Sequence, residues 1–354
     1  LVGSEMCIRD SYKTTGDYIE KLPGDELNAF GSEWYILGLA RSGRKVFDDY
    51  YKAIEKYVSE NIDENGRLDE KRATDNAKLV LVLSALDKDV TDVGGHDLLK
   101  ALSDMDYVTQ QGLSGAIYAL LAFDCRGYDI PSADKNVEQT SREGLVKYIL
   151  DKQLKDGGWA YSGDKAEPDM TAMALQALAA YYKTDAKVKE AADKAVTCLS
   201  KLQNTTGGYD SYGSVNSESA AQVITALTAL GIDPDNDARF VKNGASVLDS
   251  LCGFYVDGGG FRHVSDGKLD PTATAQGYYA LAAYYRFAGS QTALYLSLGG
   301  YMATVLTDFI QGIIMIVGIV LVIYFVMTHE VVGGLQNGLD SLRDVPETGG
   351  DLTS

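Results

Sequence analysis

The chain alternates between two kinds of helical segment. Six segments carry apolar and small residues at helical spacing on nearly all sides. A helix without a polar face is expected to be buried. These six segments are residues 32–43, 74–86, 112–123, 169–182, 217–231 and 271–285.

The segments between them are amphipathic and charged. In residues 46–61, for example, Tyr50, Ile54 and Val58 fall on one face at helical spacing, and charged residues occupy the other. This pattern predicts helices that are half exposed. The others are residues 16–22, 96–104, 141–153, 186–203 and 237–251.

Six buried and six half-exposed helices can be arranged as two concentric rings. We therefore predict an all-α fold, an α/α toroid of six inner and six outer helices. The many Ala, Gly, Ser and Thr residues of the buried segments allow inner helices to approach closely while larger neighbours fill the gaps.

A double glycine followed by an aromatic residue recurs after three of the predicted outer helices. The stretches are "QLKDGGWAYSGD", "QNTTGGYDSYGS" and "VDGGGFRHVSDG". Glycine accepts the positive φ that ends a helix and turns the chain. The aromatic residue after it can cover the end of a neighbouring helix. We interpret the repeated signal as mainly architectural.

Acidic or hydroxyl residues precede the inner segments that follow these loops. Asp169, Ser217 and Asp270 are predicted N-caps because their side chains can accept hydrogen bonds from free helical N–H groups. Pro271 fits the first helical position, where no N–H is needed.

The stretch "QLKDGGWAYSGD" resembles the glutamine–tryptophan motif of the prenyltransferase and squalene-oxidase repeat, whose family folds as an α/α toroid. The resemblance covers about residues 12–295 and includes all six inner segments. The motif is more specific for the fold than for an activity, because the family includes triterpene cyclases, protein prenyltransferases, cobalamin carriers and bacterial surface proteins.

The catalytic patterns of the enzymes in this family are incomplete here. The nearest match to the cyclase motif Asp-x-Asp-Asp is "IDPDND", with Asp233, Asp235 and Asp237, which we interpret as a solvated turn. The zinc ligands of prenyltransferases have weak counterparts in Asp249, Cys252 and His263, but the spacing is one residue too long. We predict no catalytic residues, no metal and no cofactor.

The three glycine-rich loops all precede inner helices, so connectivity should gather them at one rim of the ring. Aromatic rings with a few polar groups suit a small-molecule or glycan site. The alternative is that these side chains only pack the loops. The candidate ligand-binding residues are Trp159, Tyr161, Asp169, Tyr209, Tyr212, Glu218, Phe261 and Arg262.

Composition narrows the possible partners. The net charge is -18, which disfavours a nucleic-acid partner because phosphate binding needs a basic patch. The three histidines lie far apart in sequence, without zinc-knuckle spacing. The four cysteines have no CxxC pattern, and three of them are predicted to be buried thiols rather than disulfides.

The two ends of the chain differ from the repeats. Residues 1–11, "LVGSEMCIRDS", resemble a translated linker from metagenome assemblies, so we expect them to be foreign or disordered.

Residues 309–327 are almost wholly apolar and long enough to cross a bilayer, which predicts a membrane-associated or cell-surface location. The predicted parts are thus residues 1–11, a toroid of residues 12–290, a membrane segment of residues 291–330 and a polar tail of residues 331–354.

The last 60 or so residues, including "LGGYMATVLTDFIQG" and "VGGLQNGLDSL", resemble a fragment of the sodium/solute symporter family. A single such segment cannot form a carrier. The toroid-like residues run into it without a polar linker, which favours an assembly chimera over a natural fusion.

Three functions therefore remain open. The first is a non-catalytic toroid of a bacterial surface protein that binds a ligand or glycan. The second is a terpenoid cyclase or prenyltransferase. The third is a symporter fragment without transport activity of its own.

Overall fold

The computed structural model describes residues 2–44, 47–135, 137–289 and 324, with only the backbone of residues 2–6. The chain divides into two compact units, Leu1–Ser297 and Leu298–Ser354. Of the second unit only Tyr324 is described, and it is helical. The other described residues belong to the first unit.

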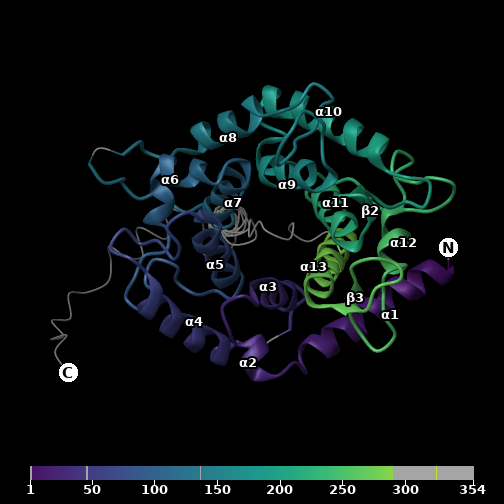
Figure 1. Ribbon diagram of the computed structural model, residues 1–354, viewed down its shortest axis with the longest axis horizontal. Coiled ribbons are helices and arrows are strands. Elements are labelled where there is room, and N and C mark those ends of the chain that lie inside the picture. Colours follow the sequence, from purple (N-terminus) through teal and green to yellow (C-terminus); the bar gives the residue numbers. More distant parts are fainter. Residues whose placement is uncertain (1, 45–46, 136, 290–323, 325–354) are drawn as a thin grey trace. The chain divides into compact units, whose positions relative to one another are not determined.

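Six helices form the inner ring of this unit (Figure 1). Each packs against the next, and the last packs against the first, so the ring closes. The predicted inner segments are confirmed, and Tyr278 and Leu281 are buried as expected. The inner helices are α3 (Glu33–Arg41), α5 (Ala73–Ala85), α7 (Leu113–Asp124), α9 (Pro168–Leu178), α11 (Ser217–Ala229) and α13 (Pro271–Ala288).

Other helices surround the inner ring (Figure 1). Their inward faces carry the periodic apolar residues, as in α10, where Val188, Ala192 and Leu199 are buried. They are α1 (Val2–Ile19), α4 (Asp48–Asn61), α8 (Arg142–Asp151), α10 (Ala186–Leu202) and α12 (Val247–Cys252), with the short α2 (Gly24–Leu27) and α6 (Met105–Gln110). Two 3₁₀ turns, Ala101–Ser103 and Ala179–Tyr181, complete the helical elements of the described residues.

Two predicted outer helices are wrong over most of their length. In residues 237–251 the helix begins only at Val247, because Asn243 and Gly244 have positive φ and form a turn. In residues 96–104 only Ala101–Ser103 is helical, and the Asp97 side chain instead accepts a hydrogen bond from Leu99 N at 2.8 Å. Local side-chain hydrogen bonds of this kind compete with helix formation.

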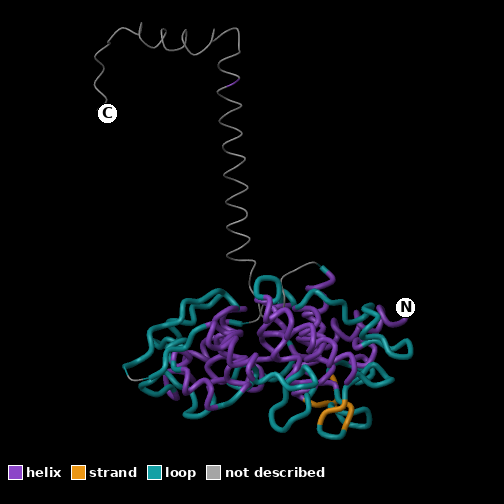
Figure 2. The backbone as a smooth tube through the Cα atoms, turned by 90° about the horizontal axis from the view of Figure 1, so that it is seen from above, coloured by secondary structure: helices purple, strands orange, loops and turns teal. Residues whose placement is uncertain are grey.

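Two small antiparallel hairpins interrupt the all-helical pattern. One pairs β1 (Asp210–Ser211) with β2 (Ser214–Val215), and the other pairs β3 (Phe261–Arg262) with β4 (Leu269–Asp270). Both lie on the same side of the ring (Figure 2). We predicted no strands, because a two-residue strand is too short to give an alternating pattern.

The helix starts are partly as predicted. Asp270 caps α13 by accepting from Ala273 N at 2.8 Å, and Pro271 is the first helical residue. The other two N-cap predictions are wrong by one or two residues. Pro168 already begins α9, and the Asn216 side chain, which accepts from Ser219 N at 2.9 Å, caps α11.

The N-terminal residues belong to the first helix. α1 extends from Val2, packs against α12 and α13, and buries Ile8 and Ser11. Residues 2–11 are therefore helical where we expected disorder. Their foreign origin stays a prediction.

The predicted membrane segment, residues 309–327, lies outside the described residues except for Tyr324, as does almost all of the tail to residue 354. Among the helices that the structure describes, none is both long enough and apolar enough to cross a bilayer.

Candidate functional site

The three glycine-rich loops share one turn. The backbone N–H of Leu154 donates to Gly158 O at 2.8 Å, and Asn204 with Gly208 and Val256 with Gly260 repeat this bond at 2.9 and 3.0 Å. Gly207 has a φ of +80°, and a Cβ there would lie 2.3 Å from Ser246 O. The glycines thus allow each loop to pack against a neighbouring outer segment, which for Gly259 is α1 at Tyr18.

Two glutamines connect neighbouring repeats through these turns. Gln153 Nε2 donates to Gly157 O at 2.7 Å and to Ala191 O of α10 at 2.8 Å. Gln203 Nε2 donates in the same way to Gly207 O and Phe240 O, at 2.9 and 2.8 Å. The glutamine of the repeated motif therefore links one outer element to the next.

The aromatic residue of each loop is part of the core. Trp159, Tyr209 and Phe261 have no exposed surface, and Trp159 Nε1 donates to Ile149 O at 2.7 Å. Thr171 Oγ1 accepts from Trp159 N at 2.9 Å, and Thr274 Oγ1 accepts from Phe261 N at 3.0 Å. These three candidate ligand-binding side chains are thus covered by the protein, which agrees with the alternative that they pack the loops.

Two tyrosines of the same loops are strongly exposed. Tyr161 is 70% exposed and Tyr212 is 87% exposed. Tyr212 and Gly213 form the tip of the β1–β2 hairpin, with φ of +53° and +86°. Two-residue hairpin tips with positive φ at both positions favour Asn-Gly or Asp-Gly. A bulky residue with positive φ is an uncommon and strained choice.

Two carboxylates, Glu167 and Asp169, lie near the exposed tyrosines. Asp169 Oδ2 accepts from Ser211 Oγ at 2.8 Å, whereas its Oδ1 is buried and has no hydrogen-bond partner among the described residues. Glu167 Oε2 accepts from Tyr161 N at 3.0 Å. The pKa of Tyr212 is raised, chiefly by the negative charge of Glu167 and to a smaller extent by burial and by Asp169.

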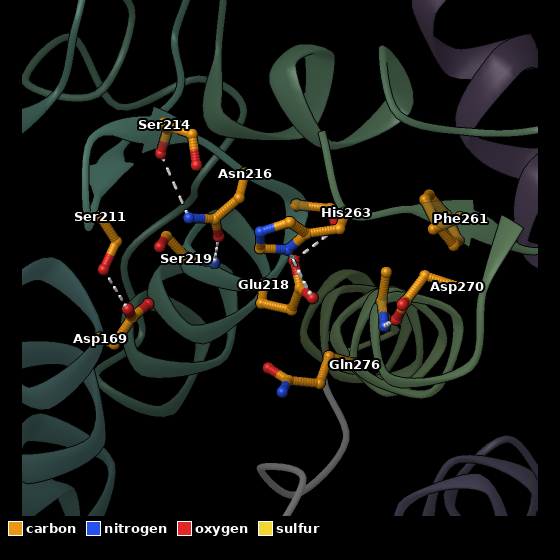
Figure 3. A network of polar contacts seen from close by, with 12 residues as sticks. Asp169, Ser211, Ser214, Asn216, Glu218, Ser219, Phe261, His263, Asp270 and Gln276 are labelled. Atoms are coloured by element: carbon orange, nitrogen blue, oxygen red, sulfur yellow. Dashed lines mark hydrogen bonds and ion pairs between the residues drawn. The ribbon is translucent and has the colours of Figure 1, made fainter. Parts of the chain in front are cut away.

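A second polar group lies where the α11 and α13 loops meet (Figure 3). His263 Nδ1 lies 2.9 Å from both carboxylate oxygens of Glu218, and Ser217 Oγ donates to Glu218 at 2.9 Å. Ser217 N also donates to His263 O at 3.1 Å. Arg262 donates to backbone carbonyls of Ser265 and Tyr255. The rim residues are therefore brought together, but mostly through contacts with one another.

The weak zinc candidates do not converge. Asp249 belongs to the capping box of α12, with Ser246 N donating to its Oδ2 at 2.9 Å. Cys252 is a partly buried thiol whose pKa burial raises to about 12, and His263 pairs with Glu218. Among the described residues, no group of three His, Cys, Asp or Glu side chains is placed to hold a metal ion.

The acidic stretch "IDPDND" forms a turn. Asp233 Oδ1 accepts from Asp235 N and Asn236 N, and Asp237 pairs with Arg239. The hydrogen bond from Arg239 lowers the pKa of Asp237. A general acid needs a raised pKa instead, so the turn agrees with the interpretation as a solvated loop.

The inside of the ring carries aromatic and amide side chains that the sequence analysis did not single out. Trp34 of α3 contacts Tyr118 of α7 and Tyr279 of α13, with ring centroids 5.8 and 5.9 Å apart. Gln222 donates to Gln276 at 2.9 Å and accepts from Gln176 at 2.9 Å. All six lie on predicted inner helices, but periodicity cannot distinguish the ring interior from the contacts between helices.

A buried acid at the start of α3 was also missed. Burial raises the pKa of Glu33, although Gly31 N donates to its Oε1 at 2.7 Å and opposes this. An acid whose pKa is raised by folding stabilises the fold below its ordinary pKa, and this contribution is lost as the pH rises through the folded value. Its ordinary value is 4.5.

We therefore expect Glu33→Gln to stabilise the protein increasingly as the pH rises above 4.5, because the amide keeps an acceptor without a charge. The measurement is the melting temperature as a function of pH. Glu143→Gln, an exposed first-turn glutamate of α8, is the control and should show no such trend. A gain that is the same at every pH would contradict the burial argument.

Comparison with known proteins gives three results. Residues 275–354 match the model of the sodium:solute symporter family, so the resemblance of the C-terminal end to a symporter fragment is confirmed. No curated protein matches the chain. Among solved structures, the chain is similar to ent-copalyl diphosphate synthase from Streptomyces platensis, with 16% identity, a TM-score of 0.46 and coverage of 73% of this chain. The alignment spans only 50% of that structure's chain, and the symporter match includes residues of α13, the last inner helix of the toroid.

Proposed function

We propose that the described unit is a non-catalytic toroid domain, of the kind found in bacterial surface proteins, that binds a neutral glycan through Tyr161 and Tyr212. The observation that carries this proposal is the conformation of Tyr212, which exposes 87% of its surface from a backbone with a φ of +53°.

The backbone strain at Tyr212 is not offset by packing of its side chain, which is mostly exposed. Residues held in sparsely populated backbone regions cost on the order of 1–3 kcal/mol and cluster at ligand sites. Asn or Gly would form the same hairpin tip at lower cost. A tyrosine that destabilises the hairpin and buries little surface is more easily explained by contact with a ligand.

The chemistry around the two tyrosines favours a neutral polyol. Phenol rings offer rigid, amphipathic contact area at low entropic cost. Glu167 and Asp169 supply carboxylate groups, which can accept hydrogen bonds from hydroxyl groups. Their negative charges would repel an anionic ligand.

A binding role is better supported than a cyclase. A cyclase needs an open apolar lumen and a carboxylic acid whose raised pKa keeps it protonated. In this ring Trp34 connects Tyr118 with Tyr279, so aromatic side chains occupy the interior, and the Asp237 carboxyl is paired with Arg239. These contacts favour a site on the loops over one inside the ring.

The C-terminal residues form a separate part of the proposal. We infer that the toroid is fused to a symporter fragment by chimeric assembly, and that residues 309–327 would contact a lipid bilayer if the chain is genuine. Long-read sequencing across codons 285–300 tests the fusion. An uninterrupted native gene would contradict the chimera.

Tyr212→Asn tests the binding proposal. We expect this variant to raise the free energy of unfolding by up to about 1 kcal/mol, because Asn fits the hairpin tip, and to weaken glycan binding about tenfold or more. Binding is measured on an array of neutral, acidic and cationic glycans and then by titration calorimetry.

Tyr161→Ala should weaken binding in the same way, while Tyr148→Ala on the outer helix α8 serves as the matched control. Binding that is absent in the wild type, or that survives both substitutions, would overturn the proposal. Preference for cationic over neutral ligands would show that the tyrosines instead form a cation–π site.

A further inference from the structure

Two of the four cysteines lie where the first outer helix meets the last. Cys7 belongs to α1 and is exposed, whereas Cys252 is the last residue of α12 and is partly buried. α1 packs against α12, so the two helices are neighbours although they come from opposite ends of the toroid sequence. Both sulfur atoms are therefore candidates for one shared reaction.

Side-chain contacts fix how α1 lies against the end of α12. Ser11 Oγ lies 4.0 Å from Cys252 Sγ, and Ser11 has no exposed surface. One turn further along, Thr14 Oγ1 shares a hydrogen bond with Tyr255 OH. Cys7 lies one turn before Ser11, and residues four positions apart on a helix share a face. Cys7 thus lies on the face of α1 that contacts Cys252.

The two thiols contact each other. The pKa of Cys252 is raised to about 12, chiefly by burial and then by the charge of Cys7 and a hydrogen bond with its thiol. A disulfide requires Cα atoms no more than about 7 Å apart. Two packed helices whose side chains already meet within one turn of both cysteines allow this approach.

The other two cysteines have different surroundings. Cys125 and Cys198 are buried, and Cys125 Sγ donates to Ala122 O at 3.1 Å. Burial raises the pKa of each thiol to about 11. An oxidant needs access to a sulfur atom in its thiolate form, so both should remain thiols in the folded protein.

We propose that Cys7 and Cys252 form a redox-sensitive pair whose disulfide joins the first outer helix to the last. The oxidant is a small-molecule disulfide such as oxidised glutathione. The exposed Cys7 thiolate attacks one sulfur of the reagent and expels the first thiolate. Cys252 then attacks the Cys7 sulfur of this mixed disulfide and expels the second. The two cysteines are oxidised, and the reagent is reduced to two thiols that take up the two protons.

The disulfide is expected to stabilise the toroid. Such a bond constrains the unfolded chain, and in the chain-entropy model its effect increases with the length of the loop that it closes. The loop from Cys7 to Cys252 includes nearly the whole ring. The pairing makes Cys7 a structural part of α1, which conflicts with the predicted foreign origin of residues 1–11. It is independent of the glycan proposal, because neither cysteine belongs to the tyrosine loops.

Peptide mapping tests the pairing. The full chain is treated with oxidised glutathione, its remaining thiols are blocked with iodoacetamide, and it is digested without reductant for mass spectrometry. We expect the Cys7 and Cys252 peptides to be linked, with a mass about 2 Da below the sum of the two thiol peptides. Cys252→Ser should stop at a mixed disulfide of Cys7 with glutathione. The control Cys198→Ser should keep the link. A wild type that also stops at the mixed disulfide, or links Cys7 to a second chain, would overturn the proposal.

Thermal unfolding measures the effect of the bond. The oxidised wild type should melt roughly 5 °C or more above the reduced form, and a reductant should reverse the rise. Cys7→Ser changes an exposed side chain and should melt like the reduced wild type under both conditions. The same redox effect in Cys7→Ser would assign it to other thiols, and a linked pair without a higher melting temperature would contradict the stabilising role.

Discussion

Trp159→Ala should lower the free energy of unfolding by about 3–5 kcal/mol, the range for removing a large aromatic side chain from a core. Trp159 has no exposed surface, and its indole N–H is bonded to Ile149 O at 2.7 Å, so the substitution leaves both a cavity and a carbonyl without its donor. Denaturation in urea, followed by circular dichroism, measures the loss.

Tyr161→Ala in the same loop is the matched control. Because Tyr161 is largely exposed, its substitution should change stability by no more than about 0.5 kcal/mol. If Trp159→Ala were as stable as the wild type but failed to bind ligand, Trp159 would belong to the binding surface after all.

Gly207→Ala should be the second strongly destabilising substitution, with a cost of about 3 kcal/mol or more from strain and displacement. Gly207 combines a φ of +80° with a backbone oxygen, Ser246 O, only 2.3 Å from the position of an added Cβ. Backbone atoms of Ser246 cannot move aside without displacing the start of α12. Thermal and urea unfolding measure the loss.

Gly213→Ala separates the two causes. Gly213 has a similar φ of +86°, but nothing lies within 4 Å of an added Cβ. Its substitution should therefore cost only the conformational strain, about 1–2 kcal/mol. Equal losses at Gly207 and Gly213 would mean that the close approach to Ser246 contributes nothing.

The ring itself could be predicted because a buried helix has no polar face, and this absence is visible in the sequence. In α5 nearly every residue from Ala73 to Ser84 is buried, so the segment lacks a polar face. In α4 only one face is buried, by Tyr50, Ile54 and Val58. This contrast, repeated along the chain, distinguishes inner from outer helices before any coordinate is known.

Hydrophobic periodicity gave wrong predictions where a few local hydrogen bonds or turn residues decide the conformation. The turn at Asn243 and Gly244 replaces a helix that the apolar spacing of residues 237–251 predicted. The Asn216 cap moves the start of α11 by one residue. Such changes depend on single hydrogen bonds. Their free energies are small compared with that of burying a whole helix face, and they produce no periodic pattern in the sequence.

The sequence by itself determined the ring of buried helices, the role of the repeated glycines as turns and the separate character of the C-terminal residues, because each of these follows from periodicity or composition. Only the tertiary structure decided which aromatic residues are available to a ligand. Trp159 and Tyr161 stand two residues apart in one loop, yet one is buried and the other is 70% exposed. The tertiary structure also brought Arg41 beside Arg286, because the contact of α3 with α13 that closes the ring joins residues from opposite ends of the toroid sequence.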